Sequence, residues 1–501
     1  MSLGPHHATL DSSTFLPAAA IPFNFAVWAA QYVKMSALLP AFRRVAFQSP
    51  SRFFVCNQCL RQAPRALPSS RIINAAQSRF FVANATGPVN ALSADAVAKA
   101  AKAKAKYEFP KTTSKAVGYW LIGSAVSVFG IVVWGGLTRL TESGLSITEW
   151  KPVTGSMPPR SQQDWEAEFE LYRASPEFKL LNPHMTLEEF KKIYFMEWSH
   201  RLWGRVIGIS FVLPTLYFIA RRRVTGKMAV NLLGISSLIG FQGFIGWWMV
   251  KSGLKDDLFA EGSHPRVSQY RLTAHLGTAF VCYSWMLLTG LSVLRARRMA
   301  ANPQAALDTI KAIHNPALVN FRRSVLAVTT LIFVTAMSGA LVAGLDAGLI
   351  YNEFPKMGLG LTPPASELWN KFYSRREDGK DLWWRNMLEN PSTVQMDHRI
   401  LAVSTFCAIL ALYAFSRRGR VGAALPRNAK KGALGLVHLV CMQVALGITT
   451  LIYMVPVPLG AAHQAGSLAV LSGALVLAHR LHVPKSTVRA LEQKLKHIKP
   501  Q

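Results

Sequence analysis

Histidines next to charged residues in apolar surroundings give this chain its clearest capacity for chemistry. Glu197, His200 and Arg201 stand together in FMEWSHRLWGR, where a long hydrophobic run begins. A charged side chain inside a membrane span costs roughly 2.5 kcal/mol or more on insertion scales, so these groups need partners and mark a site. The pattern recurs further along in VQMDHRILAV, which contains His398 and Arg399 at the same spacing.

A second histidine follows in each half, His275 in YRLTAHLGTA and His463 in AAHQAGSL. We expect all four histidines at one depth, because each lies about a turn into a span that enters from the same side. Neutral imidazole binds zinc, copper and iron, but no cysteine or acid completes a zinc site in the second half. Two opposed imidazoles are the axial arrangement for haem. The spacing therefore predicts two bis-histidine haem sites.

Arginines and small residues surround these histidines. Arg201, Arg399 and Arg271, the last one turn before His275, have the fork geometry that binds haem propionates. The alternative for each is an ion pair or interfacial snorkelling. Small side chains nearby leave the helix backbones accessible to close approach. This favours either the approach of a flat macrocycle or ordinary helix packing. They lie close to the histidines at Gly277, Ala279, Ala465 and Gly466 and in the segments WGGLTR and SGALVAG.

Composition places the histidines in a membrane. The chain has 501 residues, of which 50% are hydrophobic, with several apolar runs long enough to cross a bilayer. Eight spans are predicted, at 117–136, 196–220, 229–250, 272–294, 324–345, 396–416, 432–454 and 461–481. The net charge of +30 comes largely from the N-terminal segment and from alternate loops, as in membrane proteins with basic inner loops. We therefore expect lipid as a partner and exclude nucleic acid.

The spans form two similar sets. The end of the first span, WGGLTRLTESGLSI, aligns with the end of the fifth, MSGALVAGLDAGLIY, which places Glu142 against Asp346. Each set supplies one histidine from its second helix and one from its fourth. The sequence therefore predicts an all-α polytopic membrane protein with eight transmembrane helices arranged as two pseudo-repeated four-helix bundles.

The N-terminal region is typical of a mitochondrial presequence, because residues 35–80 contain arginine and serine but no aspartate or glutamate. Applied to an imported protein, the basic loops place both termini in the matrix. The predicted organisation is a presequence at 1–80, with 1–34 as an upstream extension, a matrix linker at 81–115, an N-terminal half at 116–295, a matrix loop at 296–323, a C-terminal half at 324–482 and a matrix tail at 483–501.

Six motifs together carry a family resemblance: GGLTRLTESGLSI, EWSHR, YRLTAHLGTA, SGALVAGLDAGLIYNEFPKMG, NPSTVQMDHR and AAHQAGSL. With these motifs, residues 115–482 resemble the mitochondrial haem A synthases. The resemblance implies an inner-membrane oxidoreductase that converts the C8 methyl of haem o to a formyl group, giving haem a for cytochrome c oxidase. It also implies that haem o synthase, a ferredoxin-type electron donor and oxidase assembly factors are partners. The resemblance leaves open whether the protein forms homo-oligomers.

The resemblance also assigns the two histidine pairs. His398 and His463 would hold a permanent haem b, while His200 and His275 would hold the substrate haem, with Glu197 matching the family glutamate. Bacterial relatives often carry a cysteine pair in an outer loop, but residues 137–195 contain no cysteine. A disulfide relay in that loop is therefore not supported.

One residue difference between the halves favours this division of labour. The second half has Gln395 where the first has Glu197, so a carboxylate lies one turn from a histidine in the first half only. Such a carboxylate could act as an acid or base, or form a structural pair with Arg201 or Arg271. Two other functions use the same histidines: a di-haem b-type electron-transfer protein without haem modification, and a repeat-built transporter.

Overall fold

The computed structural model describes residues 109–259, 265–484, 487–489 and 491–492. All of them belong to one compact unit, Ala94–Gln501. The predicted presequence at 1–80 lies outside the described residues, as do most of the linker at 81–115 and much of the tail at 483–501. Their assignments therefore remain predictions.

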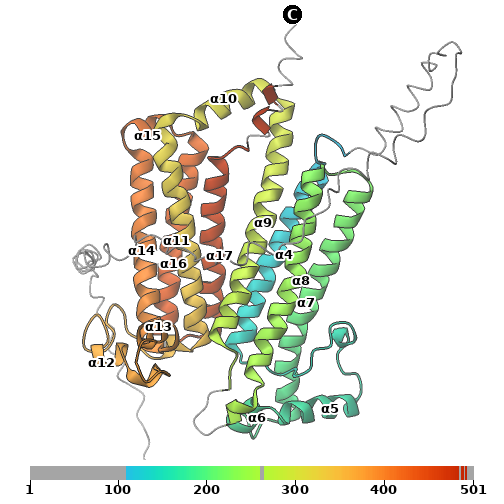
Figure 1. Ribbon diagram of the computed structural model, residues 1–501, viewed down its shortest axis with the longest axis vertical. Helices are drawn as coiled ribbons and strands as arrows, with labels where there is room; N and C mark the ends of the chain where they lie inside the picture. Colours follow the sequence, from blue (N-terminus) through green and yellow to red (C-terminus); the bar gives the residue numbers. More distant parts are fainter. Residues whose placement is uncertain (1–108, 260–264, 485–486, 490, 493–501) are drawn as a thin grey trace, which may run out of the picture. The chain divides into compact units, whose positions relative to one another are not determined.

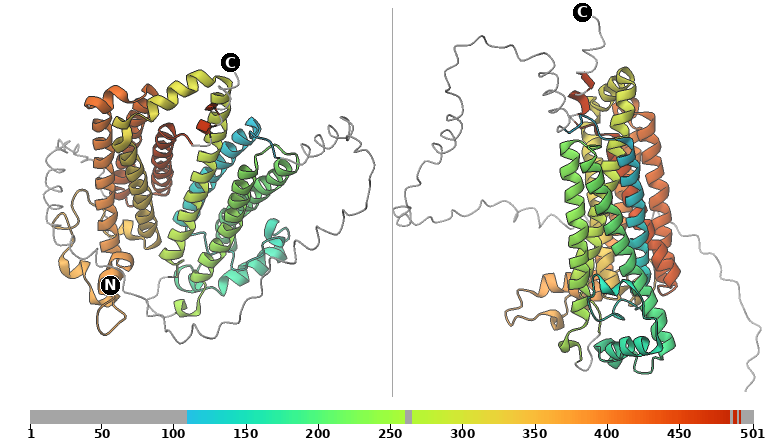
Figure 2. Two further views of the ribbon diagram at one scale, coloured as in Figure 1. Left: turned by 45° about the horizontal axis from the view of Figure 1, so that its top comes forward. Right: turned by 90° about the vertical axis from the view of Figure 1, so that its right-hand side faces the viewer.

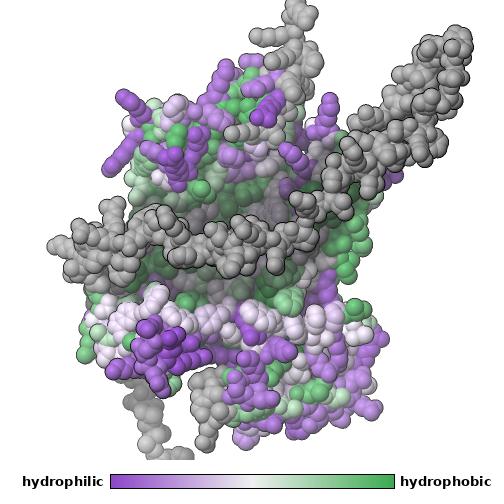
Figure 3. Space-filling view, in the orientation of Figure 1, coloured by the Kyte–Doolittle hydropathy of each residue, from purple (hydrophilic) through white to green (hydrophobic). Residues whose placement is uncertain are grey.

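Eight helices in the described residues are long and apolar enough to cross a membrane, which confirms the predicted all-α polytopic fold. They are α4 (Lys115–Leu140), α7 (Leu187–Ala220), α8 (Gly226–Val250), α9 (Gln269–Ala301), α11 (Val319–Gly344), α14 (Pro391–Arg417), α16 (Arg427–Ile452) and α17 (Val457–Arg480). On the face drawn in Figure 3, hydrophobic side chains form a band between two hydrophilic ends, as a bilayer requires.

The eight helices form two bundles of four (Figures 1 and 2). In the first bundle each of α4, α7, α8 and α9 packs on two others, in a closed ring. In the second, α11, α14, α16 and α17 form the same ring. The bundles meet where α4 and α9 pack against α11 and α17. The helices that carry histidines, α7 with α9 and α14 with α17, are diagonal in their rings.

Short helices cover both ends of the bundles. At one end, α5 (Gln162–Arg173) and α6 (Pro176–Leu181) lie in the loop between α4 and α7, while α12 (Ala365–Leu368) and α13 (Leu382–Glu389) lie between α11 and α14. At the other end are α10 (Pro303–Ile313) and α15 (Gly419–Ala424). We call the end with α5 and α13 the outer end.

Helix α7 begins nine residues before the predicted start of its span at 196. Thr186 caps it, and the Glu189 side chain accepts a hydrogen bond from the Thr186 backbone N–H in return. The added turns lie outside the apolar run but bury Phe190 and Tyr194 against Phe169 of α5 and its neighbours. Hydropathy alone missed them because their burial comes from the outer loop rather than from lipid.

Backbone geometry repeats between the bundles as well. Glu142 and Asp346, which align in the sequence, both adopt the left-handed conformation, with φ of 51° and 52°. Non-glycine residues adopt it infrequently, so the match indicates one turn used twice. The Asp346 carboxylate also forms ion pairs with Arg139 and Arg266 of the first half, at 2.5 and 3.1 Å. This turn therefore also joins the two bundles.

Candidate functional site

Each of the four histidine rings lies against a glycine on the preceding helix of its bundle. A Cβ atom added at any of these glycines would meet a ring atom at 2.8–3.1 Å, closer than real Cβ contacts normally come. The pairs are Gly135 with His200, Gly246 with His275, Gly339 with His398, and Gly447 with His463. Each glycine stands four or five residues before the last residue of its helix. The same device therefore seats four imidazoles near the outer end.

The four histidine rings share one degree of burial. All four are half-buried, although they lie in the interior of apolar bundles. Within each bundle the two imidazoles interact electrostatically, His200 with His275 and His398 with His463. Two imidazoles on diagonal helices, each backed by a glycine, fit a flat macrocycle with an axial ligand on either face. The structure thus brings together the two histidines of each predicted pair.

Glutamines on the third helix of each bundle hold one histidine of each pair. The amide Nε2 of Gln242 lies 3.1 Å from Nδ1 of His275 and donates to its backbone carbonyl at 2.8 Å. Gln443 makes the same contacts to His463 at 3.1 and 2.9 Å. Sequence reasoning missed these glutamines. Their signal is the shared spacing QxxxG, which links Gln242 to Gly246 and Gln443 to Gly447.

The other histidine of each pair differs between the halves. The hydroxyl of Ser338 lies 2.7 Å from Nδ1 of His398. The residue before the corresponding glycine in the first half is Trp134, whose indole N–H donates to the Ser199 hydroxyl at 3.0 Å instead. Within the described ranges, the His200 ring has no hydrogen-bond partner. The second bundle therefore fixes both of its rings, and the first fixes one.

Glu197 is buried and fully engaged. Its Oε1 accepts hydrogen bonds from Arg201 at 2.6 and 3.0 Å, and its Oε2 accepts from the Ser146 hydroxyl at 2.7 Å and the Ile147 backbone N–H at 2.8 Å. Arg201 also donates to the carbonyls of Ile147 and Glu149. The pair therefore holds the outer loop onto α7, one turn from His200.

The second half also ties its loop to the histidine-bearing helix, but at this position the side chain is uncharged and donates hydrogen bonds where Glu197 accepts them. Gln395 donates to the carbonyls of Ala347 and Tyr351, at 2.7 and 3.2 Å. Arg399 donates to those of Tyr351 and Lys356, both at 2.9 Å. An amide makes the loop contacts in the second half and a carboxylate makes them in the first, so at this position only the first half has a carboxylate.

Arg271, the third predicted propionate contact, is anchored differently. Its Nη1 donates to the Trp248 carbonyl at 2.6 Å, and its guanidinium lies 4.3 Å from the centre of the Trp248 ring. Stacking of this kind leaves the other guanidinium donors directed along the ring plane. Unlike Arg201 and Arg399, Arg271 does not donate a hydrogen bond to a carbonyl of an outer loop.

The small residues singled out near the histidines have other neighbours. A Cβ at Gly277 would meet the Met337 sulfur of α11, so this glycine serves the contact between the bundles. A Cβ at Gly466 would meet the Gln443 side chain. Close approach to the imidazoles instead comes from the preceding helices, including the predicted segments WGGLTR and SGALVAG.

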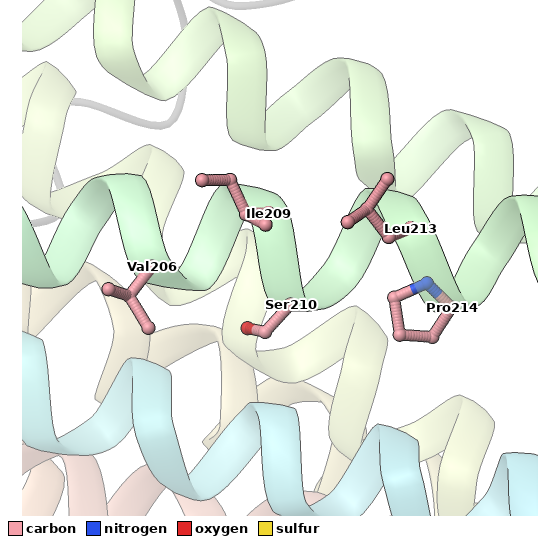
Figure 4. Close-up of a pocket in the computed structure, with 5 residues that line it drawn as sticks. All are labelled: Val206, Ile209, Ser210, Leu213 and Pro214. Carbon is pink, nitrogen blue, oxygen red and sulfur yellow. The ribbon is translucent and has the colours of Figure 1, made fainter. Parts of the chain in front are cut away.

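A shallow apolar groove of about 310 Å³ lies away from the histidines (Figure 4). Its lining residues, Val206, Ile209, Ser210, Leu213 and Pro214, all come from α7 and include no titratable group. Val206, Ile209 and Leu213 are exposed on the outward face, where lipid would pack. In the described part of the chain, no three His, Cys, Asp or Glu side chains converge on a metal position.

Comparisons with known proteins give the family. The chain is 53% identical over 386 residues to "Heme A synthase COX15" of Saccharomyces cerevisiae, covering 77% of this chain and 79% of the relative. It is 46% identical over 378 residues to the protein of that name in Homo sapiens, covering 75% and 85%. It is 50% identical over 380 residues to a "Heme A synthase-mitochondrial ferredoxin fusion protein" of Schizosaccharomyces pombe, covering 75% and 61%. The profile of the COX15-CtaA family, described as a cytochrome oxidase assembly protein, matches residues 118–475. The chain belongs to the COX15-CtaA family.

Proposed function

We propose that this protein is a haem A synthase, an enzyme of haem a biosynthesis that oxidises the C8 methyl of haem o to a formyl group. The observation that carries the proposal is the repeated seat of the four histidines, two glycine-backed pairs in two like bundles. The family's described role in cytochrome oxidase assembly supports it. The reaction replaces two hydrogens of a methyl group by one oxygen, so protons and electrons must both leave the site.

The second bundle holds the resident cofactor in this proposal, a haem b ligated by His398 and His463. The contacts from Ser338 and Gln443 favour a permanent site, since partners of the second ring nitrogen orient a ligating imidazole. When bound there, the haem supplies an iron centre that takes up and passes on single electrons. The protein's part is to fix the imidazoles and to exclude water.

The first bundle holds the substrate, haem o, between His200 and His275. Glu197 is the acid/base or water-positioning group of this half. Its support is position, since the carboxylate is 3% exposed, one turn from His200, and has no charged counterpart in the second bundle. Arg201 compensates the buried charge and orients the carboxylate. General acid or base help of this kind typically contributes about 10²- to 10⁴-fold in rate.

The arginines near the histidines are the proposed propionate contacts. Arg271 is the strongest of the three, because its Trp248 stack leaves donors available near His275. Arg201 and Arg399 spend donors on loop carbonyls, so they would meet propionates through their remaining N–H groups. Bidentate geometry makes arginine suited to carboxylates in either case.

Cell location and partners follow from the family role. We place the protein in the mitochondrial inner membrane with both termini in the matrix, because the even number of spans and the basic loops agree with that orientation. Protease digestion of terminally tagged protein in mitoplasts tests this, and cleavage of the tags from the outer side would overturn it. The fused Schizosaccharomyces pombe relative supports a ferredoxin-type electron donor. Haem o synthase and oxidase assembly factors are the proposed exchange partners, and a homo-oligomer is compatible with this arrangement.

The test is chromatographic analysis of the haems extracted from purified protein. The parent should contain haem b together with haem o and haem a. His398→Ala should lose haem b, whereas Glu197→Gln should keep it and accumulate haem o or a hydroxymethyl form. Glu188→Gln, an exposed glutamate on the same helix, is the matched control. Haem b in both bundles, with no haem o or a in any sample, would favour a di-haem electron-transfer protein instead.

A further inference from the structure

The hydrogen bond between Ser338 and His398 has a defined direction. The Ser338 hydroxyl has one hydrogen, and it donates that hydrogen to the Thr335 carbonyl at 2.8 Å, because a carbonyl can only accept. Toward Nδ1 of His398, 2.7 Å away, the hydroxyl must therefore act as acceptor. With the hydroxyl hydrogen on the Thr335 carbonyl, this contact requires the His398 tautomer that carries its proton on Nδ1, which leaves the lone pair of Nε2 for a metal.

The first bundle has no acceptor at the matching position. Trp134 precedes the glycine behind His200, as Ser338 precedes the glycine behind His398. An indole N–H can only donate, and that of Trp134 is spent on the Ser199 hydroxyl and the Met196 carbonyl. Neither tautomer of His200 is therefore preferred by a neighbouring group in the described residues.

We propose that Ser338 is a positioning residue that makes His398 a permanent haem ligand, and that Trp134 at the matching position makes His200 an exchangeable one. The proposal rests on the haem assignments above and adds what decides retention. An acceptor for Nδ1–H orients a ligating imidazole and raises its basicity, and losing such a partner typically weakens metal binding about 10- to 100-fold. The first half must take in haem o and release haem a, so a weaker hold on the haem, without this acceptor, suits it.

Two features next to the histidine rings recur in both halves and therefore do not distinguish the two sites. Gln242 and Gln443 make matching contacts with the fourth-helix histidines. The glycines behind the second-helix histidines also approach the rings to the same distance: an added Cβ would lie 3.0 Å from Nε2 of His200 at Gly135, and 3.0 Å from Cε1 of His398 at Gly339. Ser338 and Trp134 differ in what they offer to the second ring nitrogen itself, whereas Glu197 and Gln395 differ one turn away and bind the outer loop.

The experiment measures haem release from the purified, full-length protein to excess apomyoglobin, together with the low-spin electron paramagnetic resonance signal. Ser338→Ala should release haem b roughly 10- to 100-fold faster and shift the low-spin signal. Ser338→Thr keeps the hydroxyl and should restore the parental rate. Ser416→Ala is the matched control, since this buried serine of α14 bonds to the carbonyl three residues back without touching a histidine.

The reciprocal change is made in the first bundle. Trp134→Ser supplies an acceptor and should slow the release of haem o, whereas Trp134→Phe supplies none and should not. A parental release rate and spectrum in Ser338→Ala would overturn the proposal, whether or not Trp134→Ser folds. His398→Ala separates the two levels. If it loses haem b while Ser338→Ala behaves as the parent, the haem assignment stands and the role of Ser338 falls. If it keeps an unchanged bis-imidazole signal, both fall.

Discussion

Replacing Gly447 by alanine should weaken the binding of the haem that we propose for the second bundle, without unfolding the protein. The new Cβ would lie 2.8 Å from Cε1 of His463 and 3.4 Å from its Nδ1. Ordinary contact begins near 3.4 Å, so the ring or the helix must move by roughly 0.6 Å. The ring of His463 cannot rotate away freely, because Gln443 contacts both Nδ1 and the backbone carbonyl of this histidine.

Overpacking of this kind costs about 1–3 kcal/mol, and each 1.4 kcal/mol is a factor of ten in an equilibrium constant. If the strain is relieved by displacing the ligand, haem affinity should fall roughly 5- to 150-fold. Haem b per protein after purification, from the pyridine haemochrome spectrum, measures this loss. Gly246→Ala in the first bundle, with its contact at 3.1 Å, should weaken haem o binding in the same way but less.

Matched controls exist on the same helices. Gly435 of α16 and Gly243 of α8 have no atom within 4 Å of an added Cβ. Alanine at these positions should leave haem content unchanged and raise helix stability by up to about 1 kcal/mol. Full haem occupancy in Gly447→Ala would refute the argument from close approach. So would an equal loss in Gly435→Ala, which would point to glycine content in general.

Two further changes test the outer loop and the contact between bundles. Burial raises the pKa of Glu177 to about 8, with the negative charges of Glu197 and Glu142 adding to it and Tyr172 and Arg139 opposing it. The folded protein then keeps a proton that the unfolded chain loses above its ordinary pKa of about 4.3, so stability should fall as pH rises from there to about 8. Thermal unfolding at pH 6 and pH 9 should show this fall in the parent and in exposed Glu170→Gln, but a smaller one in Glu177→Gln. Gln464, next to His463, donates to the Val132 carbonyl of α4 at 2.8 Å, and Leu276 stands at the matching place in the first half. Gln464→Leu should lower the free energy of unfolding by about 1 kcal/mol, and a parental melting curve would show that this bond does not join the bundles.

The sequence predicted the fold well because apolar runs and repeated motifs are local. The eight spans, the doubling and the histidine pairs all follow from such patterns, and the helices confirm the fold. The extension of α7 was not predicted, because Phe190 and Tyr194 are buried by a loop helix distant in sequence.

Most of the residues that contact the histidines could not be predicted from the sequence. Gly246 and Gly447 look like any other small residues of a membrane helix, and only three-dimensional packing shows that a ring lies on each. Ser338 stood inside a predicted motif, but its hydrogen bond depends on the rotation of α11 against α14. The sequence shows directly that Glu197 in the first half is matched by Gln395 in the second. It does not show that both residues form hydrogen bonds with the outer loops.

The seating of each histidine on the helix just before it in its bundle bears on biogenesis. The pairs α4 with α7, α8 with α9, α11 with α14 and α16 with α17 are consecutive spans, so every glycine–histidine contact forms within one helical hairpin. A hairpin can enter the bilayer as a unit, with its imidazole already against its glycine. Opposed imidazoles meet only when two hairpins of one half associate. Under the haem assignments proposed above, each half would then complete its ligand pair when its own two hairpins associate.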